Sequence, residues 1–381
     1  MKNKQIVDSF KNLPSPSFVC EQDLLEKNLK LLKKIQDDAD VNILLALKGF
    51  ALHSTFDLCK KYLKGCCASG LHEAILAKEE FGGEVHTYSP AFKAEEFEQI
   101  VELSNHLVFN SFNQLNQFRQ KAIGKTSIGL RINPEYSSVE VDLYNPCAIN
   151  SRLGITKANF EEDNLEGVEG LHFHALCEQN VDVLEGALSV FEKNFSKYFS
   201  KLKWVNFGGG HHITRSDYDV DALIKLLKKF KLKYPHLEIY LEPGEAVAWQ
   251  TGYLMATVLD VVNNGMQIAI LDTSAEAHMP DTLAMPYKAD IRDASNANIK
   301  EFTYRLAGNT CLAGDIIGDY SFDKPLQVGD KIILEDMIHY TMVKTTTFNG
   351  IKLPSIVIKV SDSCYQIVNN FGYNEYKNRL S

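Results

Sequence analysis

The feature that most limits the fold of this chain is a regular alternation of short apolar runs with helical patterns over its first two thirds. The runs expected to be strands are Val41–Leu47, Cys66–Ser69, Glu84–Ser89, His106–Asn110, Ser127–Ile132, Val168–His174, Trp204–Gly208 and Leu237–Glu242. The segments between them that show helical spacing include Asp23–Gln36, Leu52–Leu63, Leu71–Phe81, Lys93–Leu103, Asp182–Phe199 and Asp217–Tyr234. Strands that alternate with helices are typical of a parallel sheet covered by helices.

The number of units favours an α/β fold with a closed barrel. Eight strand–helix units over roughly 200 to 250 residues match a (β/α)8 TIM-like barrel, which we expect over residues 24–245. A doubly wound open sheet stays the alternative, because counting strands does not show whether a sheet closes. After Pro243-Gly244 the pattern changes to long β-rich runs. Residues 246–381, together with residues 1–23, are therefore expected to form a second, largely antiparallel β domain.

Composition excludes several classes of function. The net charge of -9 leaves no basic surface for nucleic acid. No apolar stretch is long enough for a membrane span, and the N-terminal residues lack the apolar core of a signal peptide. The eight cysteines are scattered without a C-x-x-C pair, which favours reduced thiols over a disulfide framework or a zinc site. We expect a cytoplasmic protein that binds neither nucleic acid nor membranes.

Polar residues follow the expected strands at the end where the active site of such a barrel lies. Lys48 ends the first strand, and a buried ammonium is costly unless it is paired or its pKa is lowered. The segment HFH places His172 and His174 on one face of the sixth strand, because side chains alternate with a period of two. The pair is open to three interpretations: hydrogen-bonded core histidines, metal ligands, or an imidazole packed on a planar ligand.

The last two strands of the expected barrel end on a glycine-rich loop and a carboxylate. Gly208, Gly209 and Gly210 expose backbone N–H groups that can surround a phosphate, and loops at this place in the barrel usually do so. Glu242 either pairs with Lys48 or faces a ligand nitrogen. Pyridoxal 5'-phosphate needs an amine for its Schiff base, donors for its phosphate, a planar partner and a carboxylate beside its ring nitrogen. We therefore predict this cofactor, with Lys48 as the Schiff-base lysine and no metal.

Many segments resemble the fold-type III pyridoxal-phosphate decarboxylases, the family of the ornithine and diaminopimelate decarboxylases. The matching segments, in the order of the family, are ALKGF, CASGLHEA, SRLGI, GLHFHALCE, FGGGHH, LEPGE, GNTCLAGD and HYTMVKTTTFNG. The resemblance implies that His174 stacks on the cofactor ring, that Glu242 meets the ring nitrogen, and that Tyr340 reaches the phosphate held by the three glycines.

The same resemblance implies a homodimer with shared active sites. Cys311 in GNTCLAGD, next to Asp315, resembles the cysteine that family members bring into the active site of the partner subunit. In that position Cys311 would protonate the carbanion after carbon dioxide leaves.

Departures from the diaminopimelate decarboxylases indicate the branch. Those enzymes typically read E-P-G-R, where this chain has Glu245, and the segment LDTSAEAHMPDTLAMPYK lacks their Arg but supplies Asp272, Glu276 and Asp281. An acidic pocket suits a cationic polyamine and repels a second carboxylate. The combination GGGHHIT, EPGEA and HMPDTLAMPY resembles the carboxynorspermidine/carboxyspermidine decarboxylases. This resemblance implies formation of norspermidine or spermidine, with Glu245 and Asp281 holding the protonated amines of the substrate. Asp272, Glu276 and Asp315 are further expected substrate-binding residues.

Three alternatives stay open from the sequence. The first is a diaminopimelate or other basic amino-acid decarboxylase of the same family. The second is a metal-dependent barrel hydrolase that uses His172 and His174 with Asp272, although that class usually has its H-x-H on the first strand. The third is a non-catalytic pyridoxal-phosphate carrier, a kind of protein that usually lacks the second β domain.

Overall fold

The computed structural model describes residues 5–284 and 287–381. Residues 26–247 form one compact unit, and the chain on either side of them forms a second. Positions 285–286 belong to the HMPDTLAMPY segment, so that part of the motif lies outside the described residues. No helix within the described ranges is long and apolar enough to cross a membrane.

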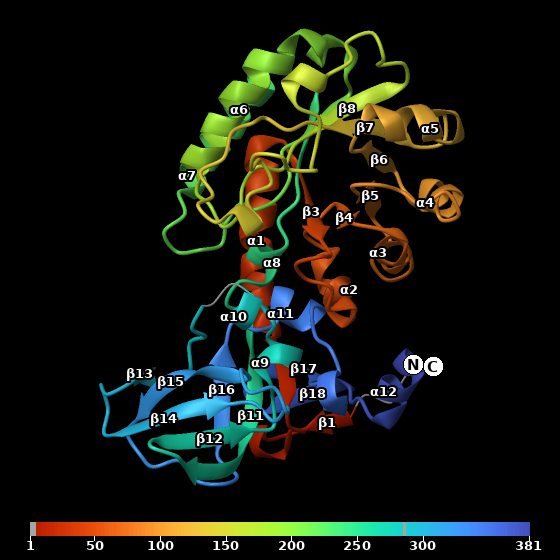
Figure 1. The fold of residues 1–381 in the computed structure, drawn as a ribbon. Helices are drawn as coiled ribbons and strands as arrows, with labels where there is room; N and C mark the ends of the chain where they lie inside the picture. Colours follow the sequence, from red (N-terminus) through yellow and green to blue (C-terminus); the bar gives the residue numbers. More distant parts are fainter. Residues whose placement is uncertain (1–4, 285–286) are drawn as a thin grey trace. The chain divides into compact units, whose positions relative to one another are not determined.

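The first unit is a closed barrel of parallel strands (Figure 1). Its strands are β3 (Asn42–Ala46), β4 (Gly65–Ala68), β5 (Glu84–Tyr88), β6 (His106–Phe109), β7 (Ser127–Arg131), β8 (Val168–His172), β9 (Trp204–Asn206) and β10 (Glu238–Leu241). The barrel closes where β10 pairs with β3, with Tyr240 opposite Asn42 and Leu241 opposite Ile43. This closure excludes the open sheet and confirms the expected barrel.

Helices follow the barrel strands, as the alternating pattern predicts. They are α1 (Gln22–Ala39), α2 (Phe56–Cys59), α3 (Leu71–Leu76), α4 (Phe97–Leu103), α5 (Phe112–Ala122), α6 (Val181–Phe195), α7 (Val220–Lys233) and α8 (Glu245–Ala248). The helix expected over Leu52–Leu63 is much shorter, because Lys61 and Tyr62 bond to carbonyls three residues back and so tighten the chain into turns. Asp219 caps α7 by accepting a hydrogen bond from the N–H of Ala222 at 2.8 Å.

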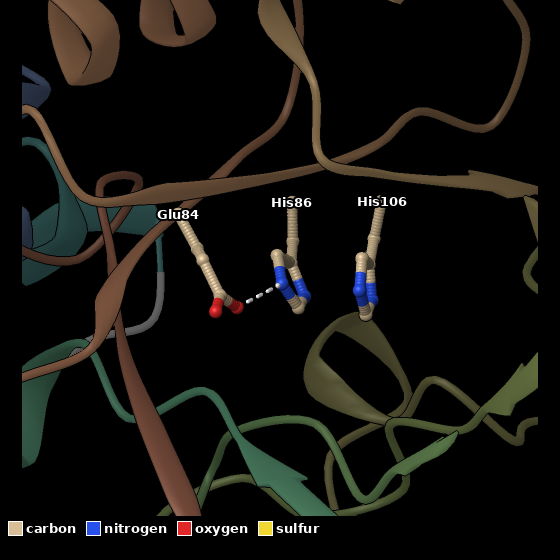
Figure 2. A group of neighbouring side chains, drawn as sticks. All are labelled: Glu84, His86 and His106. Carbon is tan, nitrogen blue, oxygen red and sulfur yellow. Dashed lines mark hydrogen bonds and ion pairs between the residues drawn. The ribbon is translucent and has the colours of Figure 1, made fainter. Parts of the chain in front are cut away.

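Large side chains fill the barrel at the amino end of its strands. Trp204 packs over two glycines of neighbouring strands: a Cβ on Gly129 would lie 2.3 Å from the Trp204 ring, and one on Gly170 would lie 2.1 Å from it. Leu44, Val108 and Tyr240 pack with Trp204 in the same cluster. Three polar side chains, Glu84, His86 and His106, also extend from β5 and β6 at this end (Figure 2). The interior is therefore packed, and the carboxyl ends of the strands are left to build a ligand site.

The second unit contains a ten-stranded, mostly antiparallel sheet among its described residues. Its strands are β1 (Gln5–Val7), β2 (Ser17–Glu21), β11 (Gly252–Asn263), β12 (Gln267–Leu271), β13 (Ser295–Asn296), β14 (Phe302–Ala307), β15 (Ile316–Phe322), β16 (Lys331–Glu335), β17 (Ser355–Ser361) and β18 (Cys364–Asn369). Among the described strand pairs of this sheet, only β2–β17 and β12–β14 are parallel. Its short helices are α9 (Ala275–His278), α10 (Asp281–Ala284), α11 (Tyr340–Val343) and α12 (Tyr373–Leu380).

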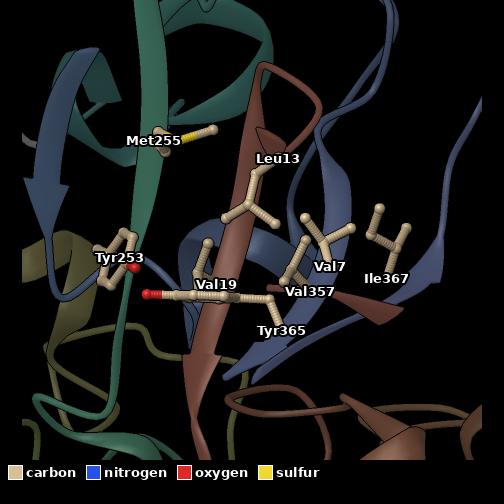
Figure 3. Close-up of a cluster of buried hydrophobic side chains, with 8 residues drawn as sticks. All are labelled: Val7, Leu13, Val19, Tyr253, Met255, Val357, Tyr365 and Ile367. Carbon is tan, nitrogen blue, oxygen red and sulfur yellow. The ribbon is translucent and has the colours of Figure 1, made fainter. Parts of the chain in front are cut away.

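Both ends of the chain contribute to the core of this unit. Figure 3 shows a cluster of buried side chains that joins residues before the barrel to residues after it: Val7, Leu13, Val19, Tyr253, Met255, Val357, Tyr365 and Ile367. Strand β2 pairs with β11 on one side and with β17 on the other. The segment before α1 is therefore a central strand of the second unit.

Candidate active site

Lys48 lies two residues beyond β3, in a tight turn at the carboxyl end of the barrel. The turn packs against the loop after β10, because a Cβ on Gly49 would lie 2.9 Å from the Cα of Gly244. Water reaches the Lys48 side chain, but the surrounding protein still desolvates its ammonium. This burial lowers the pKa of Lys48, and nearby Arg131 adds to the lowering, whereas Cys67 and Glu242 oppose it. A lowered pKa leaves more of the free amine, which is the nucleophilic form.

Glu242 directly follows β10 and lies among groups that stabilise its ionised form. Asn206, the last residue of β9, donates a hydrogen bond from Nδ2 to Glu242 Oε1 at 2.7 Å. His172 Nε2 lies 3.6 Å from Glu242 Oε2. Burial alone would raise the pKa of Glu242, but His172, His86 and Asn206 outweigh this effect and lower the pKa to about 2. The barrel therefore holds a buried negative charge at neutral pH.

The glycine loop after β9 packs directly against His174 and the end of β10. The N–H of Gly209 donates to His174 Nδ1 at 2.9 Å, and the N–H of Gly208 donates to Asn206 Oδ1 at 2.8 Å. Gly208 and Gly210 have φ values of 69° and 80°, a region that favours glycine. A Cβ on Gly209 would lie 2.3 Å from the carbonyl oxygen of Glu242. The loop has no room for a side chain, and the N–H groups of Gly208 and Gly209 bond within the protein.

His174 and His211 both lie against the glycine loop, and burial and hydrogen bonding give them different roles. Burial lowers the pKa of His174 well below its ordinary value, and Lys48 and Arg131 lower it further. A neutral ring that accepts at Nδ1 carries its proton on Nε2. Burial also lowers the pKa of His211 to about 4, and its Nε2 lies 3.1 Å from the carbonyl oxygen of Gly208. His211 therefore braces the glycine loop, a role that the sequence alone left open.

Arg131 and Tyr88 belong to the same group, although sequence reasoning did not select them. Arg131 ends β7, its guanidinium lies 4.6 Å from the centre of the Tyr88 ring, and its Nη2 donates to the carbonyl of His174 at 3.3 Å. The Tyr88 ring lies 5.7 Å from that of His172. Tyr88 and Arg131 each lie one residue before the end of an expected strand and end the observed strands β5 and β7, so the rule that selected Lys48 could have found them.

A second acidic group lies beside Lys48. Ligand atoms of Glu178, His212 and Glu245 lie within 4.8 Å of one another. Arg215 donates to His212 Nδ1 at 2.9 Å, and Nε2 of the same ring lies 4.0 Å from Glu245 Oε2. Burial raises the pKa of Cys177 to about 11, with Glu178 and Glu245 adding to the rise and Lys48 opposing it. Glu245, a predicted substrate-binding residue, thus lies beside Glu178, which the sequence did not predict to belong to the site.

The other predicted site residues belong to the second unit, and most of them already have protein partners. Asp281 forms an ion pair with Lys344, whose Nζ lies 2.7 and 2.8 Å from the two carboxylate oxygens. Lys344 also lies 5.4 Å from the centre of the Tyr340 ring, and Tyr340 begins α11. Asp272 accepts a hydrogen bond from the N–H of Thr257 at 2.7 Å.

Asp315 joins two segments that carry further predicted residues. It is buried, and its Oδ1 accepts from the N–H of Ala275 at 2.7 Å and from that of Glu276 at 3.4 Å, at the start of α9. Its Oδ2 accepts from the hydroxyl of Thr310 at 2.5 Å. Cys311 is exposed, and its N–H donates to Asn349 Oδ1 at 2.7 Å. Asp315 thus fixes the loop that presents Cys311.

The hydrolase alternative finds no support in this arrangement. Among the described residues, the groups that could hold a metal ion are Glu84 with His86 and His106, and Glu178 with His212 and Glu245. Neither group includes His172 or His174.

Comparisons with known proteins agree with this geometry. Residues 17–338 match the family model described as pyridoxal-dependent decarboxylase, C-terminal sheet domain. A carboxynorspermidine/carboxyspermidine decarboxylase from Campylobacter jejuni is 50% identical over 97% of this chain and 99% of its own length. A carboxyaminopropylagmatine decarboxylase from Synechocystis is 46% identical over 97% of this chain and 96% of its own. The crystal structure of the carboxynorspermidine decarboxylase from C. jejuni in complex with norspermidine has a TM-score of 0.90 and 49% identity, and covers 96% of this chain and 100% of that one. This chain belongs to the pyridoxal-dependent decarboxylases.

Proposed function

We propose that this protein is a pyridoxal-phosphate-dependent decarboxylase that converts carboxynorspermidine or carboxyspermidine to norspermidine or spermidine. The observation that carries the proposal is the grouping of Lys48, Glu242, His174 and the glycine loop at one end of the barrel. Near-full-length identity of 50% to an enzyme named for these substrates supports the choice of branch.

The residues at the carboxyl end of the barrel fit pyridoxal phosphate. Lys48 offers an amine of lowered pKa for the aldehyde. The glycine loop, in which the N–H groups of Gly208 and Gly209 already bond to Asn206 and His174, would hold the phosphate through its other backbone groups. Glu242, ionised at neutral pH, would pair with a protonated ring nitrogen, and His174 would pack on the ring. When bound, the cofactor withdraws electrons from the α-carbon of an amino acid and so allows its carboxylate to leave. Tyr340 would complete the phosphate site, as the family resemblance implies.

Asn206 and Arg131 are positioning residues in this proposal. Asn206 links Glu242 to the glycine loop, because it donates to the carboxylate and accepts from Gly208. Arg131 holds the His174 carbonyl and adds a positive charge that keeps the pKa of Lys48 low.

Acidic residues would hold the protonated amines of the substrate. Glu245 and its neighbour Glu178 supply two carboxylates beside Lys48, which suits a polyamine arm and disfavours a second carboxylate. Asp281 would exchange its ion pair with Lys344 for a substrate ammonium. Asp272, Glu276 and Asp315 would support the segments that contact the substrate.

We also propose a cytoplasmic homodimer with shared active sites. The exposed Cys311 of each subunit would enter the site of its partner and deliver the proton that replaces the carboxylate. All eight cysteines are free, as a reducing compartment requires.

A second candidate substrate is carboxyaminopropylagmatine, because a relative named for its decarboxylation is 46% identical. Carboxyaminopropylagmatine ends in a planar guanidinium, whereas carboxynorspermidine and carboxyspermidine end in an ammonium. The two cationic groups need different arrangements of carboxylates.

The function is tested by release of carbon dioxide from carboxynorspermidine after reconstitution with pyridoxal phosphate. We expect turnover by the wild type and none by Lys48→Arg, and we expect borohydride to fix the cofactor on Lys48 in the wild type. Absence of turnover in protein that carries the reducible cofactor would refute the proposed reaction, and a reducible adduct in Lys48→Arg would refute the assignment of the lysine.

A further inference from the structure

A second cluster of ligating side chains lies at the opposite end of the barrel from Lys48. Glu84 and His86 belong to β5, and His106 begins β6, with His86 directly opposite His106 in the parallel pairing. Residues two apart on a strand share a face, so Glu84 lies on the same side as both histidines. Figure 2 shows the three side chains extending in one direction. None of the three lies at the carboxyl end of its strand, and the proposed decarboxylation uses none of them to contact cofactor or substrate.

We propose that Glu84, His86 and His106 form a binding site for a divalent transition metal such as Zn²⁺. Their ligand atoms all lie within 4.8 Å of one another. Glu84 Oε2 and His86 Nε2 are 3.2 Å apart. Two ligands of a tetrahedral zinc ion with bonds of 2.0 to 2.1 Å are separated by about 3.3 Å, so this pair already has the spacing of a coordinated pair.

Unmatched imidazole nitrogens are the second observation. His86 is 2% exposed, and Nδ1 of His86 and Nδ1 of His106 have no hydrogen-bond partner among the described residues. Buried polar atoms are normally paired, so these nitrogens call for an explanation. Coordination through His86 Nε2 would leave its Nδ1 unpaired, so it is the His106 nitrogen that a metal ion would engage. A ring rotation of His106 would turn a nitrogen toward Glu84 and His86, and coordination would use it. Two nitrogens and one carboxylate oxygen favour zinc, nickel or copper over magnesium or calcium.

Neighbouring side chains surround the cluster, and the His106 ring would have to leave its present stack for a nitrogen to reach the ion. The Tyr240 hydroxyl donates to Glu238 Oε2 at 2.6 Å and lies 3.3 Å from Glu84 Oε2. Lys64 Nζ lies 3.2 Å from Glu84 Oε1. The His106 ring stacks between His86 at 3.9 Å and Trp204 at 4.6 Å. Glu84 Oε2, which the Tyr240 hydroxyl approaches, is also the oxygen that faces His86 Nε2. A metal bound here would link β5 to β6 and stabilise the base of the barrel.

The test is calorimetric titration of the reconstituted full-length enzyme with Zn²⁺, together with its thermal unfolding. We expect wild type to bind one ion at this cluster and to gain in Tm. Glu84→Gln keeps an acceptor for Tyr240, and His106→Phe keeps the ring stack, yet each should weaken this binding by about tenfold or more. The matched control is Glu178→Gln in the other potential metal group, which should leave the binding unchanged.

A measurement without variants keeps the proposal open to refutation if these proteins fold poorly. Wild-type crystals soaked in Zn²⁺ should show an anomalous scattering peak between Glu84, His86 and His106. No peak there, no zinc binding by wild type, or variants that bind as wild type does would each show that the cluster is only a packed polar layer and would overturn the proposal.

Discussion

Asn206→Ala tests the link between the glycine loop and the buried carboxylate. Asn206 is fully buried, and its amide makes two hydrogen bonds, one to Glu242 Oε1 at 2.7 Å and one from the N–H of Gly208 at 2.8 Å. Alanine removes both. A hydrogen bond to a charged group contributes roughly 1.5 to 3 kcal/mol, and a stranded buried N–H costs about 1 to 3 kcal/mol. We therefore expect the free energy of unfolding to fall by about 3 to 6 kcal/mol.

The assay is urea unfolding of wild type and variant in the cofactor-free state. The matched control is Asn159→Ala, which removes an exposed hydrogen bond to Thr156 and should change the free energy of unfolding by no more than about 0.5 kcal/mol. A loss for Asn206→Ala as small as that of the control would refute the reasoning.

Asn206→Asp separates charge from packing at the same position. Aspartate can still accept from Gly208, but it replaces the donor to Glu242 with a second carboxylate. Two adjacent carboxylates do not both ionise readily, so the pKa of the pair rises and stability falls as pH increases through the raised value. Urea unfolding at pH 4.5 and pH 7.5 should show the larger loss at pH 7.5, and an equal loss at both would contradict the electrostatic account.

Further predictions concern the lysine, the acidic residues and the dimer. Lys48→Met should abolish activity yet raise the Tm of the cofactor-free protein, because burial lowers the pKa of Lys48 and its charge therefore opposes folding. In thermal scans this gain in Tm should shrink as the pH rises toward 10.5, the pKa of lysine in the unfolded chain. A gain in Tm that grows with pH would contradict the prediction. Glu245→Gln and Asp281→Asn should each lower kcat/KM for carboxynorspermidine by about tenfold to a hundredfold in steady-state assays, with the absorbance of bound cofactor unchanged. Equal losses on ornithine and diaminopimelate would show that these carboxylates support the site only in a general way. Mixing Lys48→Ala subunits with Cys311→Ala subunits should restore about a quarter of wild-type activity, because half of the dimers then carry one intact site of two; no recovery after verified exchange would place both residues in one chain.

The sequence predicted the barrel well because its signals are local. Each strand is a short apolar run bounded by polar residues, and the residues at the strand ends follow from that pattern. Position and residue type alone predict Lys48, Glu242 and the glycine loop as site residues. The pairing of β10 with β3, which closes the barrel, joins residues almost 200 positions apart in the sequence. No local sequence pattern shows whether these two strands pair or stay at the open edges of a sheet.

Other parts of the site depend on long-range contacts that a single sequence does not show. From the sequence, Asp281 is expected to be a free carboxylate, but in the structure it forms an ion pair with Lys344. Asp315 reads as a partner of Cys311, whereas its carboxylate caps α9 and bonds to Thr310. The sequence pattern marks Asn206 only as a strand residue, although its side chain hydrogen-bonds both Glu242 and the glycine loop.

The most direct test of the account is a competition assay on the wild-type enzyme, reconstituted with pyridoxal phosphate. Carboxynorspermidine, carboxyspermidine, carboxyaminopropylagmatine and diaminopimelate are supplied at equal concentration, and the decarboxylated products are quantified by mass spectrometry. The account predicts that norspermidine or spermidine forms fastest and that lysine from diaminopimelate is the slowest product, because Glu245 and Glu178 repel a second carboxylate. Fastest formation of lysine would contradict it.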